Sequence, residues 1–147
     1  MYHSLTFTIG NVTRNTWNNW HLIPSARPVV SQPTPSYKYV EIPGRDGSLD
    51  LSNYLVGRPT YSDRSGSFKF YVANDYGNWV DRKTEIAQFL DGAKEMKMTL
   101  EDDPRHYYLG RFYMKEWAPG ANNSEVTIEY RVKPYKYRSN DGGAVQG

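Results

Sequence analysis

Apolar and polar residues alternate along several stretches of this chain, a pattern that predicts strands with one buried face. Leu5, Phe7 and Ile9 alternate with serine and threonine, and this stretch ends at a Gly-Asn pair. The same alternation returns near residues 67–74 and again near 125–132. We expect strands at 5–9, 17–23, 37–42, 67–74, 96–100, 107–114 and 125–132.

A single stretch has helical spacing instead. Between residues 79 and 91, apolar side chains recur at intervals that place them on one face of a helix. These residues are Trp79, Ile86, Phe89 and Leu90. Asn78 can cap the start of the helix, and Gly92 can end it. The sequence therefore predicts one helix over residues 79–91.

Four prolines, at positions 24, 28, 33 and 35, interrupt the region before the third predicted strand. Proline fixes φ and removes a backbone donor, so it prevents a regular strand ladder. We expect residues 24–36 to form an extended arm or loop. The C-terminal residues offer little to bury and are expected to be mobile. We divide the chain into one domain, residues 1–134, and a flexible tail, residues 135–147.

These elements indicate a mainly β fold with one α-helix. We expect a β-sandwich, or a partly open barrel, with a flanking helix and an extended arm or hairpin. The length of 147 residues fits one domain with its own core. Aromatic residues make up 15% of the chain, with 13 tyrosines and 4 tryptophans, which favours strands and contact surfaces over a helical bundle.

Net charge and cysteine content exclude several classes of function. The formal charge is only +2, so no global field favours nucleic acid or an anionic membrane. The chain has no cysteine, which excludes disulfides, thiolate nucleophiles and thiolate metal sites. No stretch approaches the roughly 20 apolar residues that cross a bilayer. We expect no membrane-spanning segment and synthesis in a cytoplasm.

The residue types that carry catalysis do not form a recognisable set. His3, His21 and His106 are scattered, without a metal-ligand spacing. The glycine-rich and nucleophile motifs of common hydrolases and nucleotide-binding proteins are missing. We therefore predict no catalytic, cofactor-binding or metal-binding residues, no cofactor, and a protein that is not an enzyme.

Residues 100–105, "LEDDPR", place three carboxylates together. Such a cluster can bind calcium, but a calcium loop needs ligands at alternate positions around a glycine turn, which this stretch lacks. We interpret it as a turn between two strands, in which Asp102 or Asp103 accepts a turn-capping hydrogen bond.

Residues 130–138, "YRVKPYKYR", interleave basic and aromatic side chains. Basic groups can neutralise phosphates while aromatic rings stack on bases, so a surface for single-stranded nucleic acid is one interpretation. The other is a solvated, positively charged strand edge that resists edge-to-edge aggregation.

A compact turn interrupts the strand pattern at residues 43–47, "PGRDG". Both glycines can adopt positive φ, and Asp46 can bond the backbone two residues on. Arg45 is then held outward on a rigid base. Its guanidinium suits bidentate pairing with a carboxylate in the same chain or a neighbouring copy, although an ordinary hairpin end with an exposed arginine has the same sequence.

The stretch "VEIPGRDGSLDLS" resembles the fingerprint of siphophage distal tail proteins (Dit) and related prophage tail components. Three further stretches follow in the order of that family: "YSDRSGSFKFYV", "IAQFLDGAKEMKMTLEDDPRHYYLGRF" and "VKPYKYR". The four stretches lie between residues 40 and 138, and the resemblance as a whole covers about residues 1 to 138. Longer members continue into a second, often galectin-like domain, which we do not expect in this chain because it stops soon after "PYKYR".

The resemblance implies a structural protein of the virion tail tip, made in the bacterial host cytoplasm. It implies a ring of six copies that joins the tail tube protein to the tail-tip hub or adhesion apparatus, with DNA passing through the channel. Aromatic and arginine side chains are enriched where such subunits meet. The interface or structural candidates are Tyr37, Tyr39, Gly44, Arg45, Asp46, Gly47, Tyr61, Arg64, Asp103, Gly110 and Arg111.

Tryptophans support a second hypothesis of a different class. Flat aromatic faces stack on sugar rings, so a carbohydrate-binding β-sandwich acting in host-surface recognition is the alternative. The tryptophans in question are Trp17, Trp20, Trp79 and Trp117.

Overall fold

The computed structural model describes residues 3–36, 39–41, 43–44, 47–50, 60–72, 79–118 and 124–145. Its described part is mainly β, with one helix, α1 (Trp79–Phe89). The strands are β1 (Leu5–Ile9), β2 (Val12–Asn15), β3 (Leu22–Pro24), β4 (Pro35–Ser36), β5 (Tyr39–Glu41), β6 (Ser48–Asp50), β7 (Thr60–Tyr61), β8 (Arg64–Val72), β9 (Met96–Leu100), β10 (Asp103–Ala118), β11 (Glu125–Val132), β12 (Lys136–Arg138) and β13 (Ala144–Val145).

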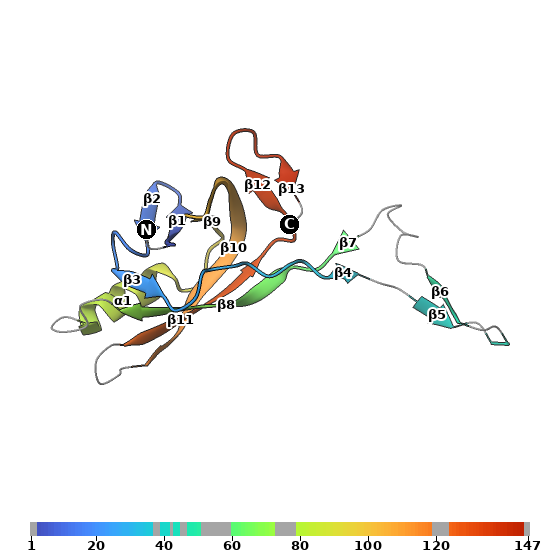
Figure 1. Cartoon of the computed structure of the whole chain (residues 1–147), viewed down its shortest axis with the longest axis horizontal. Coiled ribbons are helices and arrows are strands. Elements are labelled where there is room, and N and C mark those ends of the chain that lie inside the picture. The colour runs from blue at the N-terminus through green and yellow to red at the C-terminus, as the bar shows by residue number, and fades with distance from the viewer. Residues whose placement is uncertain are drawn as a thin grey trace.

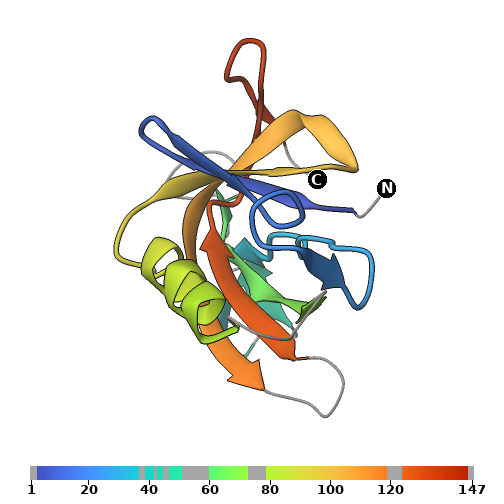
Figure 2. The same ribbon diagram turned by 90° about the vertical axis from the view of Figure 1, so that its left-hand side faces the viewer.

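One large antiparallel sheet forms the body, in the order β2-β1-β9-β10-β11-β8-β3. The sheet curls around its own apolar face, with α1 lying beside it (Figures 1 and 2). The outcome is a curled, partly open barrel with a flanking helix, which confirms the predicted fold class. The strands at 5–9, 96–100 and 125–132 are confirmed at the predicted residues.

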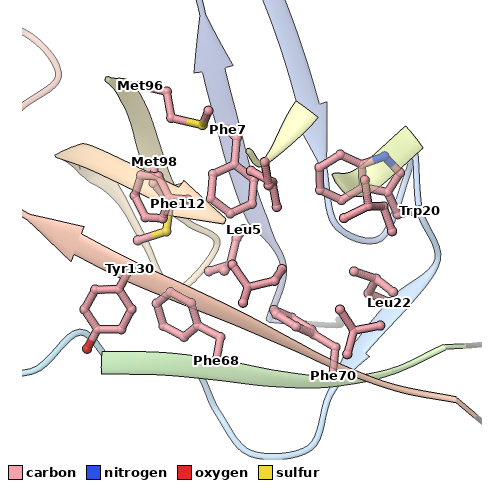
Figure 3. Close-up of a cluster of buried hydrophobic side chains, with 14 of the residues drawn as sticks. Leu5, Phe7, Trp20, Leu22, Phe68, Phe70, Met96, Met98, Phe112 and Tyr130 are labelled. Atoms are coloured by element: carbon pink, nitrogen blue, oxygen red, sulfur yellow. The ribbon is translucent and has the colours of Figure 1, made fainter. Parts of the chain in front are cut away.

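The core fills the inside of this curl (Figure 3). Phe7 packs edge-on against Phe112, with ring centroids 5.1 Å apart, and both side chains are fully buried. Phe68 stacks on Tyr130 at 4.7 Å. The predicted helix is confirmed, since α1 buries Ile86 and Leu90 follows it into the core. The body is therefore held together by aromatic packing between strands distant in sequence.

Strand β10 is twice as long as the prediction of 107–114, because it bends and changes partners along its length. Its first half pairs with β9 and β12, and its second half pairs with β11. A register shift lies between Met114 and Glu116. Gly110 lies where β11 comes closest: a Cβ there would lie against the Arg131 carbonyl oxygen and 2.5 Å from the Val132 Cα.

The predicted strand at 17–23 is wrong for most of its length, and only Leu22 and Ile23 lie in a strand, β3. Strand β2 lies earlier, at 12–15, and a turn occupies most of the predicted range. The Asn15 side chain accepts hydrogen bonds from the backbone N–H groups of Trp17 and Asn18, at 2.9 and 3.0 Å. Asparagine favours turns by bonding nearby backbone in this way, so local bonds override the aromatic content of this stretch.

The proline-rich segment at 24–36 is extended, as predicted, but only its end belongs to the arm. Residues 25–34 lie along β8 instead: the Ser25 N–H donates to the Lys69 carbonyl at 3.0 Å, and Val30 is buried. The arm begins at β4, the last two residues of that segment, and continues beyond it: β4 pairs with β7, and β5 pairs with β6. The sequence located an extended segment correctly but placed the arm too early in the chain.

The segment after residue 135 forms two short strands. Strand β12 pairs with β10 at His106 and Tyr107, and β13 pairs with β12. Tyr137 stacks on Tyr107 with centroids 5.6 Å apart. The C-terminal hairpin of β12 and β13 therefore joins the body through the first half of β10.

Candidate assembly interface

A hairpin arm projects from the body (Figure 1). Its inner part is the β4–β7 pair, and its outer part is the β5–β6 pair, in which Val40 lies opposite Leu49. Strands β5 and β6 contact each other and none of the other described elements. A two-stranded hairpin without further packing is marginally stable in water, so the outer arm is suited to a partner that covers it.

The turn of this arm uses the two glycines that the sequence singled out. Gly44 and Gly47 both have φ of 77°, and a Cβ at either position would meet nothing within 4 Å. Glycine adopts this conformation without strain, which confirms the expected backbone. Arg45, Asp46 and Tyr37 lie outside the described residues. Tyr39 is described only as part of the β5 backbone.

The base of the arm, residues 31–36 and 60–64, is fixed by Ser31. This residue forms hydrogen bonds to two strands of the body. Its N–H donates to the Tyr130 hydroxyl at 2.9 Å, and its hydroxyl donates to the Ser65 carbonyl at 3.0 Å. The Tyr130 ring passes over Gly66, where a Cβ would lie 2.6 Å from the Tyr130 oxygen. Gly66 therefore lets the ring reach the segment that leads into the arm.

Arg64 lies beneath the same segment and is only 1% exposed. Its Nε donates to the Pro134 carbonyl at 2.9 Å, and its Nη1 lies 3.5 Å from the Ser31 carbonyl. The guanidinium also covers the Tyr108 ring at 5.3 Å. Burial lowers the pKa of Arg64 and raises the pKa of Tyr108. The sequence had placed Arg64 among contact candidates, and its contacts in the structure are internal.

Two further contacts complete the base of the arm. The Ser62 N–H donates to the Thr34 carbonyl at 2.8 Å, next to the β4–β7 pair. Tyr61 packs edge-on against Tyr135 with centroids 6.1 Å apart. Two predicted candidates therefore contact neighbouring residues: Arg64 binds Pro134, and Tyr61 packs against Tyr135. Sequence reasoning missed Ser31 and Tyr130, although the glycine at 66 beside an aromatic strand was a signal for a ring lying across it.

The outer face of the sheet carries another candidate, Arg111. It lies directly opposite Arg131 in the β10–β11 register. Its Nη1 donates to the carbonyls of Gly92 and Ala93, at 3.0 and 2.8 Å, while Arg131 pairs with Asp63 at 3.1 Å. Arg111 thus holds the chain where it leaves α1. On the same face the Tyr113 hydroxyl donates to Glu129.

The acidic turn joins three parts of the chain. Glu101 accepts hydrogen bonds from Ser4, and Asp102 lies 2.7 Å from His3. Asp103 pairs with Lys136 at 3.0 Å and with His106 at 2.9 Å. The predicted turn is confirmed at this place. Its aspartates bind two distant side chains, His3 and Lys136, and one nearby side chain, His106.

At this turn, hydrogen bonds and burial shift the pKa values of the carboxylates in opposite directions. Burial alone would raise the pKa of Asp103, but the bonds from His106 and Lys136 hold it below its usual value. The bond from the Ser4 N–H likewise lowers the pKa of Glu101.

The basic stretch at 130–138 is not a strand edge, so that interpretation is wrong. Strand β11 lies between β10 and β8, and Tyr130 points into the core. Lys136 and Arg138 are each paired with an aspartate, at 3.0 Å in both cases. Paired cations are less available to phosphates, which weakens the nucleic-acid interpretation.

Strand β2 is one edge of the large sheet, and its own side chains cover part of it. Arg14 donates to the Thr13 carbonyl at 3.0 Å, and the Asn15 N–H donates to the Asn19 side chain at 2.8 Å. Side chains that cover an edge oppose pairing with another chain. The arm is therefore better suited than β2 to contact a second molecule.

The tryptophans do not form a sugar-binding platform. Trp20 is fully buried and Trp117 is 7% exposed, so both belong to the core. Trp79 stacks on Trp117 at 6.2 Å, which uses one of its faces inside the fold. Trp17 packs edge-on against His21. Among these four tryptophans there is therefore no exposed pair of rings on which a sugar could stack, as the carbohydrate-binding hypothesis would need.

Within the described ranges, no three His, Asp or Glu side chains come together in a way that could hold a metal ion. A search of the same ranges found no helix with the length and apolar character needed to cross a membrane.

Comparison with solved structures reveals a similarity of fold. No protein-family model and no curated protein matches this sequence. The fold is similar to the crystal structure of the SPP1 Dit (gp 19.1) protein, described as a paradigm of the hub adsorption apparatus in phages that infect Gram-positive bacteria. The TM-score is 0.64 at 18% sequence identity, over 91% of this chain. This chain spans 52% of the length of that protein.

Proposed function

We propose that this chain, which has the fold of a phage distal tail protein, is a structural component of a phage or prophage tail tip. In this role several copies, six by the family resemblance, close into a ring. The ring joins the tail tube protein to the tail-tip hub or adhesion apparatus and leaves a channel through which DNA passes. The chain acts by assembly, without catalysis or a cofactor, at the tip of the virion tail.

The observation that carries this proposal is the arm. Strands β5 and β6 have no contact with the other described elements, although their register places an apolar pair, Val40 and Leu49, side by side. A closed ring needs two different surfaces on each copy, one of which meets the other on the next copy. An arm that reaches away from its own body supplies one of these surfaces, and a neighbouring body supplies the other.

The first test is the oligomeric state of the full chain, seen by negative-stain microscopy and by size-exclusion chromatography with light scattering. We expect rings, or oligomers that become rings when the tail tube protein is added. A chain that remains monomeric at high concentration, after crosslinking, and with the tube protein present would contradict the proposal.

A matched pair of variants makes the test specific to the arm. Replacing residues 39–50 with a short glycine-serine linker removes the outer arm, and we expect it to abolish oligomers while the thermal midpoint stays unchanged. Replacing the β1–β2 turn, residues 10–11, with a Gly-Ser pair is the control, because β1 and β2 do not pair with β4, β5, β6 or β7, and we expect it to retain the rings.

A further inference from the structure

Two segments far apart in sequence meet at the buried guanidinium of Arg64. One is the base of the arm, residues 31–36 and 60–64. The other is the segment at residues 134–135 that enters β12. The Arg64 Nε donates to the Pro134 carbonyl and its Nη1 approaches the Ser31 carbonyl, so one side chain contacts both.

A second contact joins the same two segments above the guanidinium. Tyr61, the last residue of β7, packs edge-on against Tyr135. Neither contact is a backbone ladder, because β7 pairs only with β4 and β12 pairs with β10 and β13 among the described strands. The arrangement of the two segments therefore depends on side chains, chiefly on a planar group that fits two carbonyl oxygens.

The C-terminal hairpin is also tied to the body. Lys136, one residue beyond Tyr135, forms the ion pair with Asp103 at 3.0 Å, and Tyr137 stacks on Tyr107. The hairpin thus contacts the body, and the residues that lead into it, 134–135, contact the base of the arm. A displacement of the hairpin would move the Pro134 carbonyl that Arg64 binds.

We propose that Arg64 is the positioning residue of the arm, and that it makes the direction of the arm depend on the C-terminal hairpin. The arm leaves the body by two extended strands, so its direction is set where these strands begin. At that point, Arg64 binds the Pro134 carbonyl and Tyr61 packs against Tyr135, so the base of the arm is held to the segment that leads into the hairpin. The proposal concerns a single chain, so it can hold or fail independently of ring formation.

The experiment uses the absence of cysteine in this chain. Spin labels on Ser48→Cys, in the outer arm, and Lys83→Cys, on the exposed side of α1, report the distance between arm and body. Distances between the labels are measured by pulsed electron–electron double resonance. Labelled protein is diluted with unlabelled protein, so that only distances within one chain are measured. We expect one narrow distribution for the otherwise unchanged chain.

Arg64→Met keeps much of the side-chain volume and removes every donor, and we expect a broader distribution with a shifted mean. Tyr135→Ala and Lys136→Met act only from the hairpin side, and we expect smaller shifts in the same direction. Arg111→Met is the matched control, because it also removes two bonds to backbone carbonyls, but at the exit of α1. We expect it to leave the distribution unchanged.

A distribution in Arg64→Met equal to that of the parent would overturn the role of Arg64. If Arg64→Met does not fold, Tyr135→Ala and Lys136→Met decide the question, since both lie at partly exposed positions that the fold tolerates more readily. Unchanged distributions in both would show that the arm does not depend on the hairpin. A shift in Arg111→Met as large as in Arg64→Met would also refute the assignment.

Discussion

The body and the outer arm of this protein are built on opposite principles. In the body, nine strands and a helix enclose aromatic residues, several of them without any solvent exposure. In the outer arm, two strands of three residues each pair with one another and with nothing else among the described elements. The body obtains its stability from its own chain, and the arm leaves its surface available to another molecule.

The base of the arm lies between these extremes and uses polar contacts. Ser31, Arg64 and Tyr130 form hydrogen bonds with backbone groups there, at the margin of the apolar core to which the Tyr130 ring belongs. Hydrogen bonds depend on direction more strongly than apolar contacts do, so they suit a junction that must hold a fixed angle. The comparison predicts that changes in the body alter stability, and that changes in the arm alter assembly.

The largest effect is expected in the core of the body. Phe112→Ala removes a fully buried ring that packs against Phe7, and a substitution of this kind costs about 3–5 kcal/mol of unfolding free energy. Chemical denaturation followed by tryptophan fluorescence measures this loss. The distinction between body and arm would fail if Phe112→Ala left stability unchanged, or if deletion of the outer arm cost as much.

The next effect tests the close approach of β10 and β11. Gly110→Ala places a methyl group against the Arg131 carbonyl and the Val132 Cα, so one of the two strands must move. Overpacking of this kind costs about 1–3 kcal/mol. Thermal unfolding measures it, with Ala118→Gly at the end of the same strand as a control for alanine and glycine propensity. A stability of Gly110→Ala equal to that of the parent would show that the strands separate without cost.

Much of the body could be predicted from the sequence, because alternation survives wherever a strand has one buried face. The strand at 125–132 shows this, since its inward residues are all apolar and its partners lie on both sides. The prediction stopped β10 at residue 114, because the register shift before Glu116 breaks the alternation. It misread residues 17–23, where asparagine side chains decide the local structure.

The candidate site was harder to predict, for a physical reason. The glycines of the arm turn were found because positive φ has a local sequence signal. The contacts of Arg64 have none, since its acceptors are carbonyls at residues 31 and 134, and any residue has a carbonyl. Charge alone indicates an exposed side chain, whereas this one is 1% exposed. Only the fold brings those backbone groups together.

A smaller and local effect is expected at the turn of the arm. Gly44→Ala forces an alanine into φ of 77°, which costs about 1–2 kcal/mol for an L-residue. Because β5 and β6 contact none of the other described elements, we expect this cost to open the β5–β6 pair and to leave the midpoint of global unfolding unchanged. Amide exchange at residues 39–41 and 48–50 measures the opening.

Gly44→Asn provides the matched control, because asparagine tolerates the left-handed region better than alanine. We expect it to exchange more slowly than Gly44→Ala and to assemble better. A global midpoint that falls in Gly44→Ala would mean that the arm contributes to the stability of the body, contrary to the comparison. Equal exchange in both variants would mean that φ at residue 44 is not the cause.

The smallest effect concerns the ties of the body to its own C-terminal hairpin. Burial raises the pKa of Asp103, but the bonds from His106 and Lys136 outweigh it and leave the folded-state pKa below the unfolded value. The folded state therefore binds a proton less readily than the unfolded state does. This contribution to stability is present in full above the unfolded pKa, near 3.9, and is lost as pH falls through the folded pKa. Partly exposed pairs of this kind contribute about 0–1 kcal/mol.

Denaturation midpoints measured between neutral pH and acid should therefore fall less steeply in Asp103→Asn than in the parent. Glu85→Gln, at an exposed position of α1, controls for the loss of one negative charge. Because the described residues of the outer arm have no contact with the body, the protection of their amides from exchange should be the same in both proteins over this range. If acid opened the arm together with the body in the parent, and Asp103→Asn prevented both, the two regions would form one cooperative unit after all.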